Sequence, residues 1–180
     1  MNCPSCGAPM ILKAGEDHLT CDYCGAMHFP DPNPDGVRDL GVETQSNCPR
    51  CATHLTHATV AGQRILYCGH CHGMLLNMGV FLAVIEEMRS RQPSSQYAGK
   101  QPDWSDVDRH INCPTCGKEM DTHPYAGPGN VIIDTCETCE ENWLDYGELQ
   151  RIVRAPDQRF VTLIDEDERR EIALGKFEDN

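Results

Sequence analysis

The twelve cysteines of this 180-residue chain fall into six Cys-x-x-Cys pairs, with none left over. Spacers of 14, 16 and 19 residues join the six pairs into three couples, and longer segments separate one couple from the next. Four thiolates on two tight turns form a tetrahedral site that suits Zn²⁺ and leaves no coordination position open for a substrate. The sequence therefore predicts three structural zinc ions per chain. The predicted ligands are Cys3, Cys6, Cys21, Cys24, Cys48, Cys51, Cys68, Cys71, Cys113, Cys116, Cys136 and Cys139.

A disulfide framework is the competing interpretation of so many cysteines. It requires an oxidising compartment, which secreted proteins usually reach by means of a signal peptide. The chain opens Met-Asn-Cys-Pro, without a basic segment followed by an apolar one, and it has no apolar run of about 18 residues that could span a membrane. Bridges within Cys-x-x-Cys pairs would also close only tiny loops and constrain the unfolded chain little. We therefore expect zinc, a cytoplasmic location and no membrane contact.

Each couple begins with the same phrase, Asn-Cys-Pro-x-Cys, at residues 2–6, 47–51 and 112–116. Proline restricts φ after the first thiolate, and glycine after the second tolerates a left-handed conformation, so the phrase predicts a zinc knuckle. Strained turns are expected where another residue replaces that glycine, at Ala52, His72 and Glu140.

The elements that position the knuckles are predicted to be β-hairpins. Turn residues at 14–17, 61–63 and 126–130 separate short strand-like runs within the three couples. A unit of about 40 residues buries too little apolar surface to be stable alone, so we expect the metal to hold each unit together. This combination of knuckles and hairpins predicts three zinc ribbons.

Residues 136–149 read Cys-Glu-Thr-Cys-Glu-Glu-Asn-Trp-Leu-Asp-Tyr-Gly-Glu-Leu. This segment resembles the bacterial transcription factor IIB-type zinc ribbon family, in which the second knuckle runs into a Trp-Leu-Asp-x-Gly-Glu-Leu helix start. Residues 75–81 are a diverged copy at the same offset, whereas the first ribbon stops matching after Gly25. The resemblance implies the zinc ribbon fold and bound zinc.

The predicted fold is small, metal-stabilised and mainly β, with three zinc ribbons made of short antiparallel hairpins. An α-helix follows the second and third ribbons, and a helical tail ends the chain. Asn77 and Asp145 are the predicted N-caps, and Glu148 has the spacing of a capping box. The predicted boundaries are ribbon 1 at 1–29, a linker at 30–46, ribbon 2 with an apolar helix at 47–91, a linker at 92–108, ribbon 3 with its helix at 109–154, and an acidic helical tail at 155–180.

The charge of the chain favours some partners over others. The formal net charge is −13, and each set of four thiolates around Zn²⁺ adds a charge of about −2. Between Asp134 and Glu148 six acidic residues occur without a basic one. Such a surface repels nucleic acid and favours a basic protein, although a run of charge is also typical of a solvated face. The chain has no phosphate-binding loop, nucleophile elbow or His-Glu-x-x-His motif, so we expect no enzymatic activity.

Two features leave alternatives open. The apolar helix after ribbon 2 either packs on the ribbons or docks a partner or a second copy of the chain, and Trp143 is either a lid on its own ribbon or an interface anchor. Four histidines near ribbon 2 are ordinary surface and core residues, or they form a second metal site or a pH-sensitive patch. They are His54, His57, His70 and His72.

The predicted function is that of a zinc-binding, non-enzymatic adaptor or regulator that docks a basic protein partner. One alternative is a transcription-associated ribbon that contacts RNA polymerase or nucleic acid. Another is a redox or zinc-sensing switch, because Cys-x-x-Cys thiolates can oxidise and release their metal. The predicted partner-binding residues are Val80, Phe81, Val84, Ile85, Met88, Glu140, Glu141 and Glu148.

Overall fold

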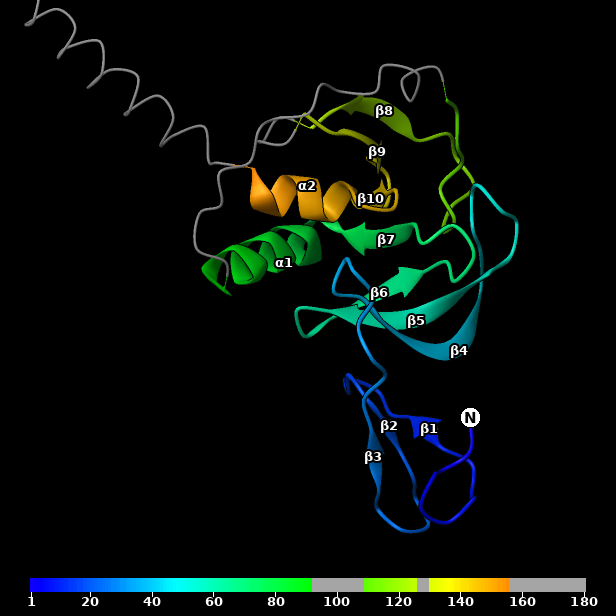
Figure 1. Cartoon of the computed structure of the whole chain (residues 1–180). Helices are drawn as coiled ribbons and strands as arrows, with labels where there is room; N and C mark the ends of the chain where they lie inside the picture. The colour runs from blue at the N-terminus through cyan, green and yellow to red at the C-terminus, as the bar shows by residue number, and fades with distance from the viewer. Residues whose placement is uncertain (92–108, 126–129, 156–180) are drawn as a thin grey trace, which may run out of the picture.

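Two antiparallel sheets carry the three ribbons in the computed structural model, which describes residues 1–91, 109–125 and 130–155 (Figure 1). The first sheet has the strand order β1-β2-β3 and the second the order β4-β5-β6-β7-β10-β9-β8. The helices are α1 (Met78–Arg91) and α2 (Glu148–Arg154). The strands are β1 (Ile11–Leu12), β2 (Leu19–Thr20), β3 (Met27–His28), β4 (Arg38–Asn47), β5 (His54–Val60), β6 (Gln63–Tyr67), β7 (Met74–Asn77), β8 (Asp121–Pro124), β9 (Ile132–Cys136) and β10 (Glu141–Leu144).

The predicted hairpins form within each ribbon. Strand β1 pairs with β2 across the turn at 14–17, and β5 pairs with β6 as far as Val60 opposite Gln63. Strand β8 pairs with β9, and most of the turn predicted between them, 126–129, lies outside the described residues. The linker predicted at 92–108 and the helical tail predicted after Ala155 also lie outside them. The prediction of a mainly β fold, with a helix after each of ribbons 2 and 3, is confirmed.

Strand β4 corrects the prediction of a linker at 30–46. Residues 38–47 form an edge strand of the large sheet and pair antiparallel with β5, with two irregularities in the register. The strand is rich in polar and charged residues, which edge strands tolerate because one side faces solvent. Its sequence therefore lacks the apolar alternation by which a strand is normally detected.

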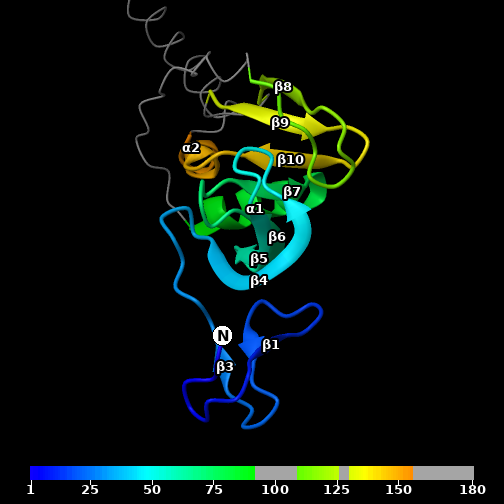
Figure 2. The same cartoon turned by 90° about the vertical axis from the view of Figure 1, so that its right-hand side faces the viewer.

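Ribbons 2 and 3 share one sheet because β7 and β10 pair antiparallel, with Leu75 opposite Trp143 and Leu76 opposite Asn142. Helices α1 and α2 lie side by side against this sheet (Figures 1 and 2). The guanidinium of Arg89 on α1 donates a hydrogen bond of 2.7 Å to the carbonyl of Ile152 on α2. The two ribbons and their helices therefore form a single packed body.

Ribbon 1 lies beneath β4, as both views show (Figures 1 and 2). Its small core consists of Cys3, Met10, Leu19 and Cys21, and Val42 of β4 packs against this core. Arg64 at the start of β6 also donates hydrogen bonds to the backbone carbonyls of ribbon 1 at Lys13 and Glu16. Ribbon 1 therefore keeps its own core and meets the rest of the chain along a narrow contact.

The apolar stripe of α1 faces the core of the chain itself. Phe81 and Val84 have no exposed surface, Ile85 is 7% exposed, and the ring of Phe81 meets that of Tyr125 edge-on. The predicted N-cap is confirmed, because the side-chain oxygen of Asn77 accepts a hydrogen bond of 3.0 Å from the Gly79 amide. Of the two alternatives for this helix, packing on the ribbons is therefore the correct one.

The start of α2 differs from its prediction. The helix is capped at Gly147, whose φ of 85° lies in the left-handed region, and the Asp145 side chain makes no cap bond. Half of the predicted capping box is present, since the Glu148 carboxylate accepts from the Asp145 amide at 2.7 Å. The Gly147 amide donates instead to Asp35, 2.9 Å away in the segment predicted to be a linker. A long-range contact thus replaces the local cap, because the Asp145 carboxylate has other partners.

Candidate metal centres

The six Cys-x-x-Cys turns share one backbone geometry. In five of them the amide of the first cysteine donates to the carbonyl five residues on, as from Cys3 to Ala8, at 2.7–2.9 Å. The residue after the second cysteine has positive φ in all six turns. It is glycine in three turns, and it is Ala52, His72 or Glu140 in the others, with φ of 58°, 63° and 55°. The expectation of strained knuckles at these three residues is confirmed, because non-glycine residues rarely adopt this conformation.

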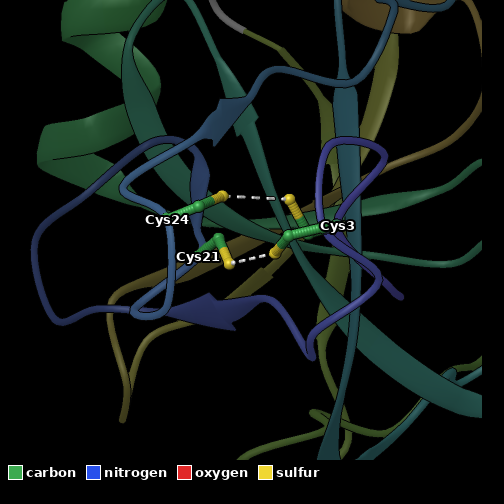
Figure 3. A group of neighbouring side chains, drawn as sticks. Cys3, Cys21 and Cys24 are labelled. Atoms are coloured by element: carbon green, nitrogen blue, oxygen red, sulfur yellow. Dashed lines mark hydrogen bonds between the residues drawn. The ribbon is translucent and has the colours of Figure 1, made fainter.

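Each ribbon brings its four sulfur atoms together, all within 4.8 Å of one another. In ribbon 1 the Sγ atoms of Cys3 and Cys24 are 3.6 Å apart, and Figure 3 shows Cys21 and Cys24 facing Cys3 across the site. The Sγ atoms of Cys48 and Cys71 in ribbon 2, and those of Cys116 and Cys136 in ribbon 3, are also 3.6 Å apart. A tetrahedron with Zn–S bonds of about 2.3 Å has S···S edges of about 3.8 Å, so these sets have the size of a ZnS₄ site.

The same distances decide against disulfides. A disulfide bond brings two sulfur atoms to about 2.05 Å, which is far shorter than the closest separation of 3.5 Å here. All twelve cysteines are free thiols. Each set contains two buried cysteines, one from each knuckle, while the other two are more exposed. The chain therefore holds three structural zinc ions in closed Cys₄ sites, as predicted.

At least one thiol in each ribbon has a lowered pKa. A hydrogen bond from the Ser5 amide lowers the pKa of Cys3 to about 6. Burial opposes ionisation of Cys68, yet hydrogen bonds from the Cys71 amide and the Thr53 hydroxyl lower its pKa to about 6. The Lys118 amide lowers the pKa of Cys116 to about 7. The pKa of Cys21 in ribbon 1 is lowered as well, chiefly by a hydrogen bond from the Cys24 amide. Since zinc binds thiolates, each site offers at least one ligand that is substantially deprotonated at neutral pH.

The histidines around ribbon 2 do not form a second metal site. Within the described residues, the three Cys₄ sets account for all clusters of three or more metal-binding side chains with ligand atoms this close. His70 Nδ1 lies 3.3 Å from Cys51 Sγ, so it supports a ligand. His72 Nδ1 lies 2.6 Å from the Tyr67 hydroxyl, and its ring meets that of Tyr146. Burial lowers the pKa of His57. These contacts favour the ordinary structural interpretation of the histidines.

Trp143 lies between two of the metal sites. It has no exposed surface and belongs to a cluster that contains Cys48 and Cys68 of ribbon 2 together with Cys113 and Cys136 of ribbon 3. Trp143 is thus more than a lid on its own ribbon, because it also anchors the interface between two ribbons of the same chain.

A charge network accompanies this tryptophan, with Asp134, Asp145 and Arg109 largely buried and Arg50 exposed at its edge. Arg109 donates to Asp134 at 2.8 Å and to Asp145 at 2.5 Å, and Arg50 of the ribbon 2 knuckle pairs with Asp145 at 2.8 Å. The Trp143 indole N–H donates to the same carboxylate at 3.1 Å. Burial raises the pKa of Asp134, whereas at Asp145 the hydrogen bond from Arg50 and the charge of Arg109 outweigh burial and lower the pKa.

The sequence did not predict this network, which changes the interpretation of the six acidic residues between Asp134 and Glu148. Asp134 has no exposed surface and Glu148 is 5% exposed, while Asp145 is mostly covered and ion-paired. No basic residue occurs within this run of sequence, yet two of its acids form ion pairs with arginines from elsewhere in the chain. Asp134 pairs with Arg109, and Asp145 pairs with Arg109 and Arg50. One feature of the sequence could have indicated the network, namely Arg50 inside the Cys-Pro-Arg-Cys knuckle. The zinc site fixes the position of this knuckle, so a charged residue within it is expected to have a defined partner.

Burial also corrects the predicted partner-binding residues. Phe81, Val84, Ile85 and Glu148 are buried within the chain, so in this fold they offer no surface to a partner. The remaining four predicted residues differ in how far they are exposed to solvent. Val80, Met88 and Glu141 are partly buried, and Glu141 accepts from the Thr115 hydroxyl at 2.7 Å, which leaves Glu140 as the exposed member of the set.

Three Cys₄ knuckle pairs on short antiparallel hairpins define a triple zinc ribbon protein. Two family comparisons agree with this class. Residues 112–155 match the family described as a transcription factor zinc finger, of the TFIIB zinc ribbon type, and residues 1–80 match the family described as a double zinc ribbon. The resemblance seen at residues 136–149 is therefore confirmed. Ribbons 1 and 2 are matched together by the second family model. No curated protein and no solved structure matches the chain. None of the helices in the described ranges is long and apolar enough to cross a membrane.

Proposed function

We propose that the chain is a cytoplasmic, non-enzymatic adaptor that docks a basic protein through exposed carboxylates held in place by zinc. Each metal site is filled by four thiolates, so the metal supports structure and offers no position for a substrate. The observation that carries the proposal is the second knuckle of ribbon 3, at Cys136 and Cys139, which exposes Glu137 and Glu140 beside a site of net negative charge. Opposite charges on two proteins speed their encounter and fix their orientation.

The test uses zinc-loaded, full-length protein as bait in a nuclease-treated extract at low and high salt. Wild-type bait should retain a protein partner that is released as the salt concentration rises. The double variant Glu137→Lys/Glu140→Lys should lose at least about tenfold in affinity for that partner. Equal zinc content in all samples, measured on the same batches, excludes loss of the fold.

A matched control separates a local effect from a general one. Glu43→Lys/Glu86→Lys makes the same change in net charge at two exposed acids on β4 and α1. This variant should keep the partner. Equal losses of affinity in the two double variants would show that binding depends on net charge alone. Unchanged affinity in both would show that the ribbon 3 knuckle does not contact the partner.

A second candidate function is a transcription-associated ribbon that contacts RNA polymerase. The match of residues 112–155 to the transcription factor zinc-finger family favours it. Binding to the polymerase would be a protein contact and so is compatible with the net charge of −13, whereas direct binding to nucleic acid would be opposed by that charge. Recovery of polymerase subunits in the nuclease-treated capture supports this candidate. Loss of all capture after nuclease treatment would support nucleic acid instead.

A further inference from the structure

The third strand of ribbon 1 has a neighbouring strand on one side only. Among the described residues, β3 pairs with β2 and with no other strand, and it forms one side of the small sheet (Figure 1). The third strands of the other two ribbons, β7 and β10, each pair with the second strand of their own ribbon and also with each other. Within the described part of the chain, ribbon 1 therefore lacks the neighbour that ribbons 2 and 3 provide for one another.

The three third strands correspond residue by residue. In each ribbon, the residue before the second knuckle lies opposite the residue three positions after the last cysteine of that knuckle. These pairs are Thr20 and Met27, Tyr67 and Met74, and Thr135 and Asn142. Residues 27–29 therefore occupy the places of residues 74–76 in ribbon 2 and of residues 142–144 in ribbon 3.

The shortness of β3 follows from its missing neighbour. Strand β7 pairs with β6 through two residues, Met74 and Leu75, just as β3 pairs with β2 through two residues. The other residues of β7, Leu76 and Asn77, pair with β10 alone. The two-residue strand of ribbon 1 is thus what β7 would be without β10.

The backbone of β3 has hydrogen-bonding groups on the side away from β2, which we call its free side. Along an antiparallel strand, the N–H and C=O groups of successive residues point alternately to one neighbour and to the other. The Cys21 amide donates to the Ala26 carbonyl at 2.8 Å, so Ala26 and His28 point toward β2. Met27 and Phe29 therefore point to the free side.

Pro30 does not block the free side. A proline protects the side of a strand when its missing N–H would have pointed outward. By the same alternation, however, the backbone of Pro30 is directed to the side of β2. The free side of β3 therefore keeps the donors and acceptors that a further strand needs.

The side chains next to the free side are apolar and exposed. Met27 is 64% and Phe29 49% exposed, whereas the corresponding residues of ribbon 2, Met74 and Leu76, are 0% and 1% exposed. Met74 lies opposite Leu144 of β10, and both belong to the core that includes residues of α1 and α2. Apolar side chains that meet a neighbouring strand in ribbon 2 thus face solvent in ribbon 1.

The local charge of ribbon 1 does not oppose contact with a second copy. Three basic side chains match the three acidic ones around its turn and second knuckle, namely Lys13, Arg38 and Arg64 against Glu16, Asp17 and Asp22. Lys13 pairs with Asp22 at 2.9 Å, and Arg64 donates to the Glu16 carbonyl. The net charge of −13 therefore arises from other parts of the chain.

We propose that two copies of the chain associate through the free sides of β3, so that each supplies the strand that the other lacks. In the register that joins β7 to β10, Met27 of one copy lies opposite Phe29 of the other, and His28 lies opposite His28 between these pairs. A strand with a free side is a template for a strand of another chain. This inference goes beyond the proposed function, because it involves ribbon 1 alone and requires no basic partner.

The test is sedimentation of the zinc-loaded, full-length chain at a series of concentrations up to about 1 mM. The wild type should form pairs of chains with a dissociation constant of about 100 µM or less, as expected of a small, transient contact. Met27→Lys/Phe29→Lys places lysine opposite lysine and should weaken the association at least about tenfold. This variant is less acidic than the wild type, so repulsion between whole chains would not explain the loss.

Two further variants show whether the contact is specific. Met27→Lys/Phe29→Glu places lysine opposite glutamate across the two copies and should recover part of the lost association. Leu82→Lys changes an exposed apolar residue of α1 and should leave the association unchanged. Zinc content and circular dichroism verify that each variant is folded.

NMR identifies the residues in contact. In a mixture of copies labelled at the methionine methyl groups and unlabelled copies, the Met27 methyl group should show a nuclear Overhauser effect to the Phe29 ring of the other copy. The register requires this contact, because the two side chains are cross-strand partners.

Three outcomes would overturn the inference. The wild type would remain a single chain at about 1 mM, or it would associate equally well as the Met27→Lys/Phe29→Lys variant, or the associated sample would lack the contact between Met27 and Phe29. Salt separates this association from the proposed function. High salt releases a basic partner, but it screens repulsion between two acidic chains and should not weaken their association. Failure here leaves the ribbon 3 knuckle unaffected, since that proposal is tested by the Glu137/Glu140 variant.

Discussion

The indole ring of Trp143 occupies the space that a side chain at Gly73 would need. A Cβ atom built at Gly73 would lie 2.3 Å from Cζ2 and 2.9 Å from Cε2 of Trp143, and both atoms belong to a rigid buried ring. Gly73 ends the second knuckle of ribbon 2, and Trp143 belongs to β10 of ribbon 3. The absence of a side chain at one position therefore allows two ribbons to pack closely.

Gly73→Ala should destabilise the chain by about 1–3 kcal/mol, because the ring can move only by disturbing the cluster around two zinc sites. In a chain of this size that loss lowers Tm by about 2–4 °C for each kcal/mol. Thermal unfolding of zinc-loaded protein measures it. The control is Gly69→Ala in the same knuckle, where a Cβ would meet its nearest neighbour at 3.6 Å. Equal melting temperatures of the two variants would contradict the close packing described here.

Arg109→Ala should cost about 3–5 kcal/mol, because it leaves the buried carboxylate of Asp134 without its ion pair. Chemical denaturation with a constant zinc supply measures the loss. Replacing both partners in Arg109→Leu/Asp134→Asn should restore most of the stability, since no uncompensated charge remains. The exposed pair of Arg91 and Glu87 gives the comparison, and Arg91→Ala should change stability by less than about 1 kcal/mol. A small effect of Arg109→Ala would show that the buried network carries little energy.

Removal of zinc from ribbon 2 should weaken zinc binding in ribbon 3, because ligands of both sites pack against Trp143. In Cys68→Ala we expect zinc release from ribbon 3 to a chelator to be about tenfold faster than in the wild type. In Cys21→Ala, which disrupts ribbon 1, release from ribbon 3 should be unchanged because ribbon 1 has a separate core. Time courses with a colorimetric chelator, combined with zinc counts by mass spectrometry, measure both. Identical release from ribbon 3 in the two variants would disprove the coupling.

Zinc should be retained at pH 7 and lost as the pH falls below about 6. The folded-state pKa values of Cys3 and Cys68 are about 6, lowered from the ordinary 9.0, whereas burial raises the pKa of Cys48 to about 11, so Cys3 and Cys68 are the ligands that stay ionised to the lowest pH. A group whose pKa is lowered by folding contributes stability above its unfolded pKa, and this contribution is lost as the pH falls through the folded value. Bound zinc lowers these values further, so release begins below them. Zinc content after gel filtration at a series of pH values tests this, and zinc loss already at pH 7 would contradict it.

The sequence was sufficient to predict the ligands and the local turns, because both depend on short-range chemistry. Cys-x-x-Cys spacing fixes the knuckle, and a turn residue between two short runs fixes a hairpin. The cap at Asn77 was likewise predictable, since its hydrogen bond reaches only to Gly79.

Contacts between distant residues were not predictable in this way. Strand β4 is polar and becomes a strand only because β5 offers it an edge. Arg109 neutralises two acids that follow it by 25 and 36 residues, so a count of charge along a window of sequence misjudges that surface. The apolar residues between 80 and 88 of α1 were predicted correctly to lie on one face of a helix. The sequence did not indicate whether that face is buried within the chain or binds a partner.

The pairing of β7 with β10 has one more consequence. Leu75 and Trp143 occupy the same place in their two ribbons and are direct partners across the strands. Equivalent residues face each other in this way only about a two-fold axis, so ribbons 2 and 3 are related as the two subunits of a symmetric dimer are. The chain contains, in effect, a dimer with both subunits on one polypeptide. Either ribbon alone would expose its third strand as an open edge, and the other ribbon closes that edge permanently.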